Sequence, residues 1–151
     1  MGVALQNQGN FDEAIVVYKK SISIKPNYDD AHHNIGLILL DQGKLDQAIT
    51  VFKKVISINA NYADAYNNMA IAFKNQGKFD ESIESCERAL KVKPDYPDAY
   101  NNLGVALKNQ GKLEQAIDAF MKSISLKPDY AEAYSNMGIT FKDQGKLDEA
   151  I

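Results

Sequence analysis

A column of asparagine side chains is the feature of this sequence whose residue type and spacing point most directly to binding chemistry. The column recurs every 34 residues, at Asn34, Asn68, Asn102 and Asn136. The residue before each one is also polar, and these neighbours are His33, Asn67, Asn101 and Ser135. A side-chain amide carries both donors and an acceptor, so a column of amides can hold an extended peptide backbone without reading its sequence. The alternative is an asparagine ladder that only ties neighbouring helices together.

The asparagine column belongs to a wider stripe on one helix face that core packing does not explain. In the best-defined copy this stripe consists of Asp98, Asn101, Asn102, Val105, Lys108 and Asn109. Its apolar member recurs as Leu37, Ile71 and Ile139, and its lysine as Lys74. At about 100° per residue, the centre of the stripe lies roughly 150° around the helix from the apolar core stripe. Asparagine in the middle of a helix costs roughly 0.5–0.7 kcal/mol relative to alanine, so its recurrence favours a role in binding.

No constellation of residues in the chain predicts catalysis. A phosphate-binding glycine loop, a His-Glu-x-x-His motif and a glycine-flanked serine are all absent from the sequence. His32 and His33 are adjacent, so their side chains point about 100° apart and cannot chelate one metal ion alone. We interpret His32 as a core substitute for tyrosine and Cys86 as a buried structural thiol. The sequence therefore predicts a protein that is not an enzyme and that needs no metal ion or cofactor.

Composition narrows the range of partners. The 151 residues carry a net charge of −3 and an isoelectric point near 5.4. Nucleic-acid-binding domains are typically basic, so this acidic balance argues against a nucleic-acid partner. No apolar run approaches the length of a membrane span, and the single cysteine excludes an intramolecular disulfide. We expect a protein or peptide partner, no nucleic acid or membrane partner, and a cytoplasmic or nucleocytoplasmic location.

The elements that must position the asparagine column come from an internal repeat. A Gln-Gly pair recurs with a period of 34 residues, and its glycines are Gly9, Gly43, Gly77, Gly111 and Gly145. Around Gly111, one apolar stripe precedes the glycine and a second one follows it. The first stripe occupies positions i, i+3, i+4 and i+7 of a helix, at Tyr100, Leu103, Gly104 and Leu107. A period of this length indicates a repeat array, in which each unit is two antiparallel helices joined by a short glycine turn.

The period also sets the expected boundaries. We expect a single array over residues 1–151, with three full units and a partial unit at each end. The full units are 29–62, 63–96 and 97–130, and the partial units are 1–28 and 131–151. Asp129, followed by Glu132, predicts an N-cap and capping box at the start of a first helix. Pro97 suits a first helical position.

The order of residues within a unit resembles the tetratricopeptide repeat. It runs from an aromatic residue through Leu-Gly, a large apolar residue, the turn glycine, alanine and a second aromatic residue to proline, as the unit 97–130 shows. Departures are mild: His32 replaces the first aromatic residue, Ala60 the proline and Cys86 the second aromatic residue. The resemblance implies an all-α, right-handed superhelical solenoid of helix-turn-helix repeats, whose inner groove is lined by the first helix of each unit.

The asparagine column is similar to the asparagine ladder in the repeat arm of O-GlcNAc transferase, which grips the backbone of protein substrates. The resemblance implies that the column contacts a peptide backbone, and that Asp30, Asp64 and Asp98 contact its side chains. One hypothesis is a scaffold module that holds an extended peptide in the groove. The other is the substrate-recruiting arm of a glycosyltransferase whose catalytic domain is not in this chain. The carboxylate clamp of chaperone-binding relatives is not expected, because acids, asparagines, His33 and Ser135 stand at its positions.

The partial units predict a further contact. Their apolar side chains lack part of the unit that would cover them, and these residues include Val3, Leu5, Leu147 and Ile151. A second copy of the chain can supply such a cover. We therefore expect end-to-end self-association, in which the last helices of one molecule pack on the first helices of another.

Overall fold

Every element that the structure describes is an α-helix. The computed structural model describes residues 3 and 9–145. Its helices have 13 or 14 residues each. They are α2 (Phe11–Ile24), α3 (Asp29–Asp41), α4 (Leu45–Ile58), α5 (Ala63–Asn75), α6 (Phe79–Val92), α7 (Pro97–Asn109), α8 (Leu113–Leu126) and α9 (Ala131–Asp143). The all-α fold class predicted from the repeat is confirmed.

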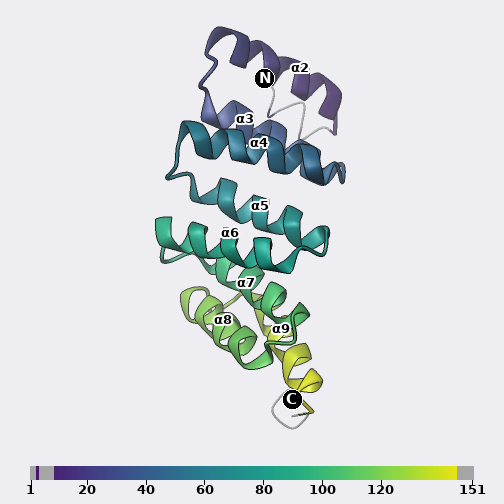
Figure 1. Ribbon diagram of the computed structural model, residues 1–151, viewed down its shortest axis with the longest axis vertical. Coiled ribbons are helices and arrows are strands. Elements are labelled where there is room, and N and C mark those ends of the chain that lie inside the picture. Colours follow the sequence, from purple (N-terminus) through teal and green to yellow (C-terminus); the bar gives the residue numbers. More distant parts are fainter. Residues whose placement is uncertain (1–2, 4–8, 146–151) are drawn as a thin grey trace.

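The helices stack in two layers along one axis (Figure 1). We call α3, α5, α7 and α9 the first helices, because each opens a unit, and α2, α4, α6 and α8 the second helices. Successive first helices contact one another, whereas successive second helices make no comparable contacts within the described chain. Because the first helices approach each other more closely, their layer is the inner side of the stack. The predicted solenoid is confirmed, and the asparagine column belongs to its inner layer.

A glycine turn joins the two helices of each unit. Gly43 has a φ of 71°, a left-handed conformation that glycine adopts without steric cost. The backbone N–H of Lys44 donates to the carbonyl of Leu39 at 2.9 Å, and that of Gly43 donates to the carbonyl of Leu40 at 3.0 Å. The helix therefore ends in a Schellman motif. The other four turn glycines have φ values of 74–77°, which confirms the role predicted for the Gln-Gly pair.

The start of each first helix differs from the prediction. The N-cap is in each case the tyrosine just before the helix: Tyr28, Tyr62, Tyr96 and Tyr130. The capping box predicted at Asp129 is wrong, since α9 has no side-chain cap and Asp129 lies outside the helix, before its N-cap. The phenols of Tyr62 and Tyr96 donate to acids of the preceding unit instead, so at these two places the residue before the helix joins two units. Pro97 is the first residue of α7, as predicted.

The two helices of a unit meet at a glycine and a phenylalanine. Phe120 has no exposed surface, and a Cβ added to Gly104 would lie 2.6 Å from a carbon of its ring. In the unit 63–96 the equivalent positions hold Ala70 and Cys86, both fully buried. Because Cys86 is smaller than phenylalanine, it leaves room for the Cβ of Ala70. The size of one residue in each pair therefore sets the size of the other.

The preference between glycine and alanine should reverse between these two units. Gly104→Ala forces a Cβ into the Phe120 ring and should destabilise the protein by about 1–3 kcal/mol, although alanine is the better helix former. Ala70→Gly removes a buried methyl group that has room, and should cost about 1–2 kcal/mol through lower helix propensity and lost burial together. Urea denaturation of both variants checks this prediction. A Gly104→Ala variant as stable as the wild-type protein would contradict the close approach.

Candidate functional site

The column asparagines form a ladder of hydrogen bonds between successive first helices. The first column is His33, Asn67, Asn101 and Ser135, and the second column is Asn34, Asn68, Asn102 and Asn136. We call the contact between two successive first helices a joint. At each of three joints, the Nδ2 group of a second-column asparagine donates to a first-column residue of the preceding unit, at a distance of 3.0 Å. The pairs are Asn68 with His33 Nε2, Asn102 with Asn67 Oδ1, and Asn136 with Asn101 Oδ1. The ladder that the sequence left open as an alternative is therefore present in the structure.

The two columns differ in exposure. The first-column residues of the ladder are buried, with exposed fractions of 8% for His33, 5% for Asn67 and 1% for Asn101. In the second column Asn102 is 8% exposed, whereas the other members are half-buried: Asn34, Asn68 and Asn136. The first column of the ladder is thus enclosed within the inner layer, and most of the second column reaches its surface.

The predicted acidic residues hold tyrosines of the following unit. Two N-cap tyrosines donate their hydroxyl groups to the acid near the start of the preceding first helix: Tyr62 to Asp30 at 2.8 Å and Tyr96 to Asp64 at 2.6 Å. Tyr130 faces Asp98 in the equivalent arrangement. Burial raises the pKa of all three tyrosines, and the neighbouring carboxylates raise it further. One oxygen of Asp30 and one of Asp64 are therefore engaged in the stack, while both acids remain exposed residues.

Aliphatic side chains and lysines border the ladder. Leu37, Ile71 and Val105 are half-buried, and Ile139 of α9 is 45% exposed. Lys74 and Lys108 are half-buried in the last turns of α5 and α7. Lys74 Nζ donates to Asn102 Oδ1 at 3.4 Å. Acids at the start of the first helices, amides and aliphatic groups in their middle, and lysines at their end together form a surface that we call the inner wall.

His32 and Cys86 occupy structural positions. His32 is half-buried, and its Nε2 atom lies 2.9 Å from the carbonyl oxygen of Pro26. Cys86 is fully buried in α6, and burial raises the pKa of its thiol to about 12, so it is protonated at neutral pH. The described residues include no group of three His, Cys, Asp or Glu side chains that could hold a metal ion. Within the same part of the chain, no helix has both the length and the apolar character of a membrane span.

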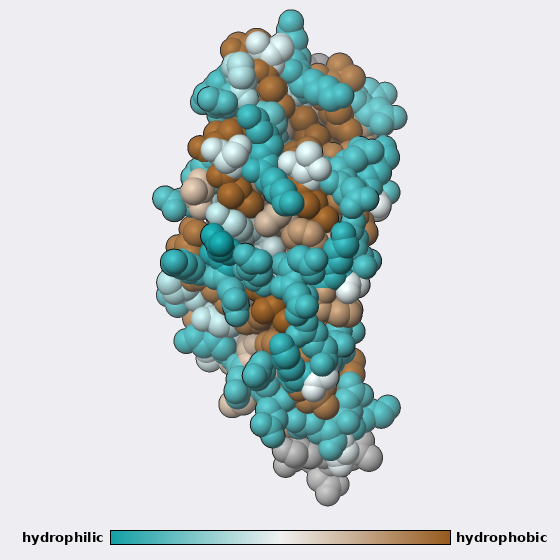
Figure 2. Space-filling view, in the orientation of Figure 1, coloured by the Kyte–Doolittle hydropathy of each residue, from teal (hydrophilic) through white to brown (hydrophobic). Residues whose placement is uncertain are grey.

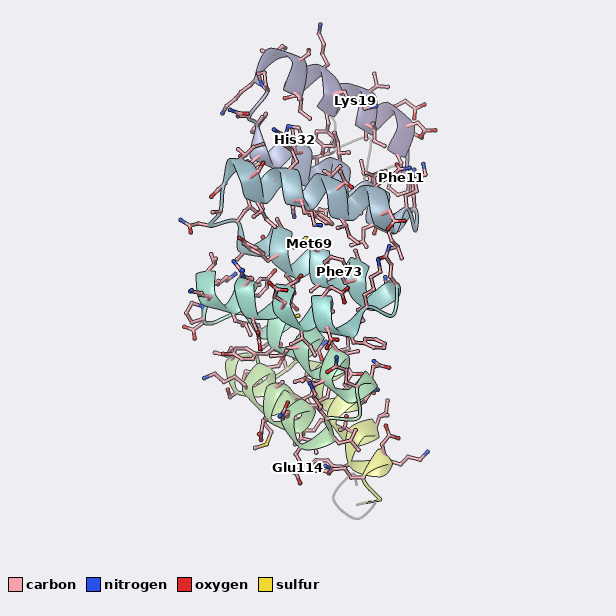
Figure 3. The ribbon with its side chains drawn as sticks, in the orientation of Figure 1. Phe11, Lys19, His32, Met69, Phe73 and Glu114 are labelled. Atoms are coloured by element: carbon pink, nitrogen blue, oxygen red, sulfur yellow. The ribbon has the colours of Figure 1, made fainter. Side chains whose placement is uncertain are left out.

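Two of the hollows on the outer side of the stack reach apolar side chains of the first helices, which helical periodicity did not predict. One of about 510 Å³ lies over α3, and its floor includes Ile35 and Leu39. One of about 370 Å³ lies over α5 between α4 and α6, where Figure 3 shows Met69 and Phe73. Ile35, Leu39 and Met69 are almost fully buried, and Phe73 is half-buried. They are reached from outside because successive second helices do not pack together, and Figure 2 shows apolar patches between the polar ridges of this face.

The fold and the inner wall together define a helical-repeat scaffold, and comparison with family models identifies the repeat family. A model described as a TPR repeat matches residues 2–43, 36–77 and 72–111. Two models described as tetratricopeptide repeats match residues 97–130 and 119–151. The chain therefore belongs to the tetratricopeptide repeat family, whose members are typically non-catalytic scaffolds for protein interaction. No curated protein matches the chain.

Solved structures share this architecture over nearly the whole chain. A crystal structure of MamA is 31% identical, covers 99% of this chain and 88% of that chain, and has a TM-score of 0.88. A MamA fragment from Desulfovibrio magneticus RS-1 is 21% identical, with coverages of 99% and 84% and a TM-score of 0.89. YrrB, described as a TPR protein with an unusual peptide-binding site, is 18% identical, with coverages of 99% and 77% and a TM-score of 0.78. The last two similarities concern the fold alone.

The tyrosine–aspartate bonds should make the stability of the protein sensitive to alkaline pH. Folding raises the pKa of Tyr62, Tyr96 and Tyr130 above 10.0. Their stabilising effect is therefore fully present below pH 10.0 and is lost as the pH rises through the folded pKa values. Replacing all three by phenylalanine should cost about 0.5–1.5 kcal/mol per hydrogen bond at neutral pH. Thermal midpoints from about pH 8 to about pH 11 should then fall less for this variant than for the wild-type protein, and an equal fall would contradict the coupling.

Proposed function

We propose that the chain is an interaction scaffold that binds an extended stretch of a partner protein along the inner wall. The observation that carries this proposal is the set of amide groups that the ladder leaves unused. Each ladder bond uses one N–H of a second-column asparagine, and the amide has a second N–H and a C=O. The half-buried Asn68 and Asn136 thus keep one donor and one acceptor, in an orientation that the ladder bond fixes. A peptide backbone offers the matching acceptor and donor.

The spacing of the second column suits such a ligand. Packed helices lie about 8–10 Å apart, and an extended chain rises about 3.3 Å per residue. A ligand that runs along the stack would therefore meet one second-column asparagine at about every third residue. Contacts of this kind involve the backbone, so the remaining side chains of the ligand are free to vary.

The residues predicted from the sequence take three roles in this proposal. The second column contacts the backbone of the ligand: Asn34, Asn68, Asn102 and Asn136. The buried first column holds those amides in place: His33, Asn67 and Asn101. Flanking residues meet the side chains of the ligand: Asp30, Asp64, Asp98, Ile71, Val105, Lys74 and Lys108. The alternative function, an arm that recruits substrates for a glycosyltransferase, would use the same wall. Peptide binding by YrrB, a protein of this fold, supports either use.

Two variants that break the same ladder bond separate binding from stacking. Asn101→Ala and Asn136→Ala each remove the bond between these residues, but only Asn136→Ala removes an amide that reaches the surface. Both should lose about 1–3 kcal/mol of stability, because each leaves a polar group without its partner. Asn101→Ala should lose at least as much as Asn136→Ala, because Asn101 Nδ2 also donates to Glu132 Oε1 at 3.1 Å.

A peptide array probed with the wild-type protein and both variants provides the test. We expect the wild-type protein to retain a set of extended peptides, Asn101→Ala to bind them somewhat more weakly because it frees the Asn136 amide, and Asn136→Ala to bind them more weakly still. Affinities of both variants equal to that of the wild-type protein would assign the column to stacking alone. An array that retains no peptide would reject the proposed function.

End-to-end self-association is a separate proposal. Leu5, Leu147 and Ile151, on which it depends in part, lie outside the residues that the structure describes. Val3 is described and is 52% exposed, which supports an apolar contact at that end. Analytical ultracentrifugation over a wide concentration range tests it, and a monomer at the highest concentration would reject it.

A further inference from the structure

One joint of the ladder differs from the other two. Asn67 and Asn101 accept the ladder bond with an amide oxygen, whereas the joint between α3 and α5 uses the imidazole of His33. At three other places a lysine stacks on an N-cap tyrosine: Lys25 on Tyr28, Lys93 on Tyr96 and Lys127 on Tyr130. Beside Tyr62 the equivalent residue is Asn59, whose Nδ2 donates to Asp29 Oδ2 at 3.0 Å. Of the ladder residues that the structure describes, only His33 can titrate near neutral pH.

His33 is enclosed by two aromatic rings and faces two acids. The centroid of its ring lies 4.8 Å from that of Tyr62 and 5.7 Å from that of Phe52 in α4. The charged groups that act on it are Asp30 of its own helix and Asp64 of α5, and Asp30 already accepts a hydrogen bond from Tyr62. Burial lowers the pKa of His33 below its ordinary value of 6.5, and the two carboxylates oppose this only in part. The imidazole is therefore neutral at pH 7.

The hydrogen bond to Asn68 depends on that neutral state. Asn68 Nδ2 is a donor, so His33 Nε2 accepts and the imidazole carries its proton on Nδ1. Protonation places an N–H on Nε2, which then faces another N–H. The bond forms again only if the Asn68 amide rotates by half a turn and offers Oδ1 to His33. After this rotation, the NH₂ group stands where the carbonyl stood.

We propose that the joint between α3 and α5 is a pH-sensitive element of the inner wall, in which protonation of His33 turns the Asn68 amide around and replaces an acceptor for the ligand with a donor. Its effect on binding rests on the proposed function, whereas the rotation itself does not. A backbone N–H of a bound peptide would then face an N–H of Asn68. Affinity therefore falls as the pH is lowered, through this joint alone.

The same protonation acts on stability, with a defined sign. Because folding lowers the pKa of His33, the protonated form is disfavoured in the folded state. The stabilising effect is fully present above pH 6.5 and is lost as the pH falls from there through the folded pKa. One proton is involved, so the unfolding equilibrium constant rises by at most about tenfold per pH unit within that window.

The chain offers its own matched control for this inference. His33→Asn gives the joint the amide acceptor that the other two joints have, and His32→Gln removes the histidine outside the ladder. Urea unfolding and NMR from about pH 7.5 to about pH 5 compare these variants with the wild-type protein. We expect the wild-type protein and His32→Gln to lose stability, the Asn68 amide resonances to shift together with the His33 titration, and His33→Asn to lose less. Equal loss in His33→Asn, or Asn68 resonances that do not follow His33, would overturn the inference.

Measurements of peptide affinity test the effect of this joint on binding. They also distinguish a failure of the pH-sensitive joint from a failure of the proposed function. The probe is a peptide selected on the array at about pH 7.5 and free of histidine and acidic residues, so that the ligand does not titrate. We expect its affinity for the wild-type protein to fall about fivefold towards pH 5, the effect of one hydrogen bond, and to change little for His33→Asn. An array without any bound peptide refutes the proposed function itself. A peptide held equally well by the wild-type protein at both pH values leaves that function in place and refutes the pH-sensitive joint.

Discussion

Side-chain hydrogen bonds that cross from one unit to the next hold the inner layer in register. Ladder bonds join residues 35 positions apart and tyrosine–aspartate bonds join residues 32 positions apart. A third set joins residues 30 positions apart, from Gln76 to Asp46 and from Gln110 to Asp80. A unit of two helices cannot bury its apolar faces alone, so its stability comes from its neighbours. Apolar contacts alone would tolerate sliding, whereas these directional bonds fix where each group of the inner wall lies along the stack.

A ladder and a binding surface make different demands on the same asparagine. The ladder needs only a donor from the second column, yet each of those residues also carries an acceptor that the ladder does not use. The oxygen of Asn102 shows what such an acceptor can do, because the ammonium group of Lys74 donates to it. The two columns therefore have different roles. The buried first-column residue fixes the orientation of the second-column amide, and the second N–H and the C=O of that amide remain available for a ligand. The two interpretations of the column are therefore compatible.

The fold followed from the sequence because its signals are local to one helix or one turn. The apolar spacing around Gly111 specifies a pair of helices, and a Gln-Gly pair specifies the left-handed turn between them. The sequence predicted the inner wall only in part. Helical periodicity gives the direction of a side chain around its own helix, but it does not show which residue of the next first helix that side chain contacts. For that reason the sequence could place Asn67 and Asn68 on one face but could not tell which of them is buried. The same limit explains the wrong capping box at Asp129 and the unpredicted hollow over Met69.

Identical units present identical surfaces, so any property confined to one place in the array must come from a departure from the repeat. Departures inside a unit, such as Ala70 with Cys86, compensate in size and leave the stack unchanged. Departures at a joint are not compensated in this way. His33 stands where the other two joints have an asparagine, and an imidazole can become charged whereas an amide cannot. Asn59 stands where the other units have a lysine that stacks on the N-cap tyrosine. The first kind preserves the scaffold and the second changes what one joint can do. The unchanged joints nearby then give the reference against which that change can be measured.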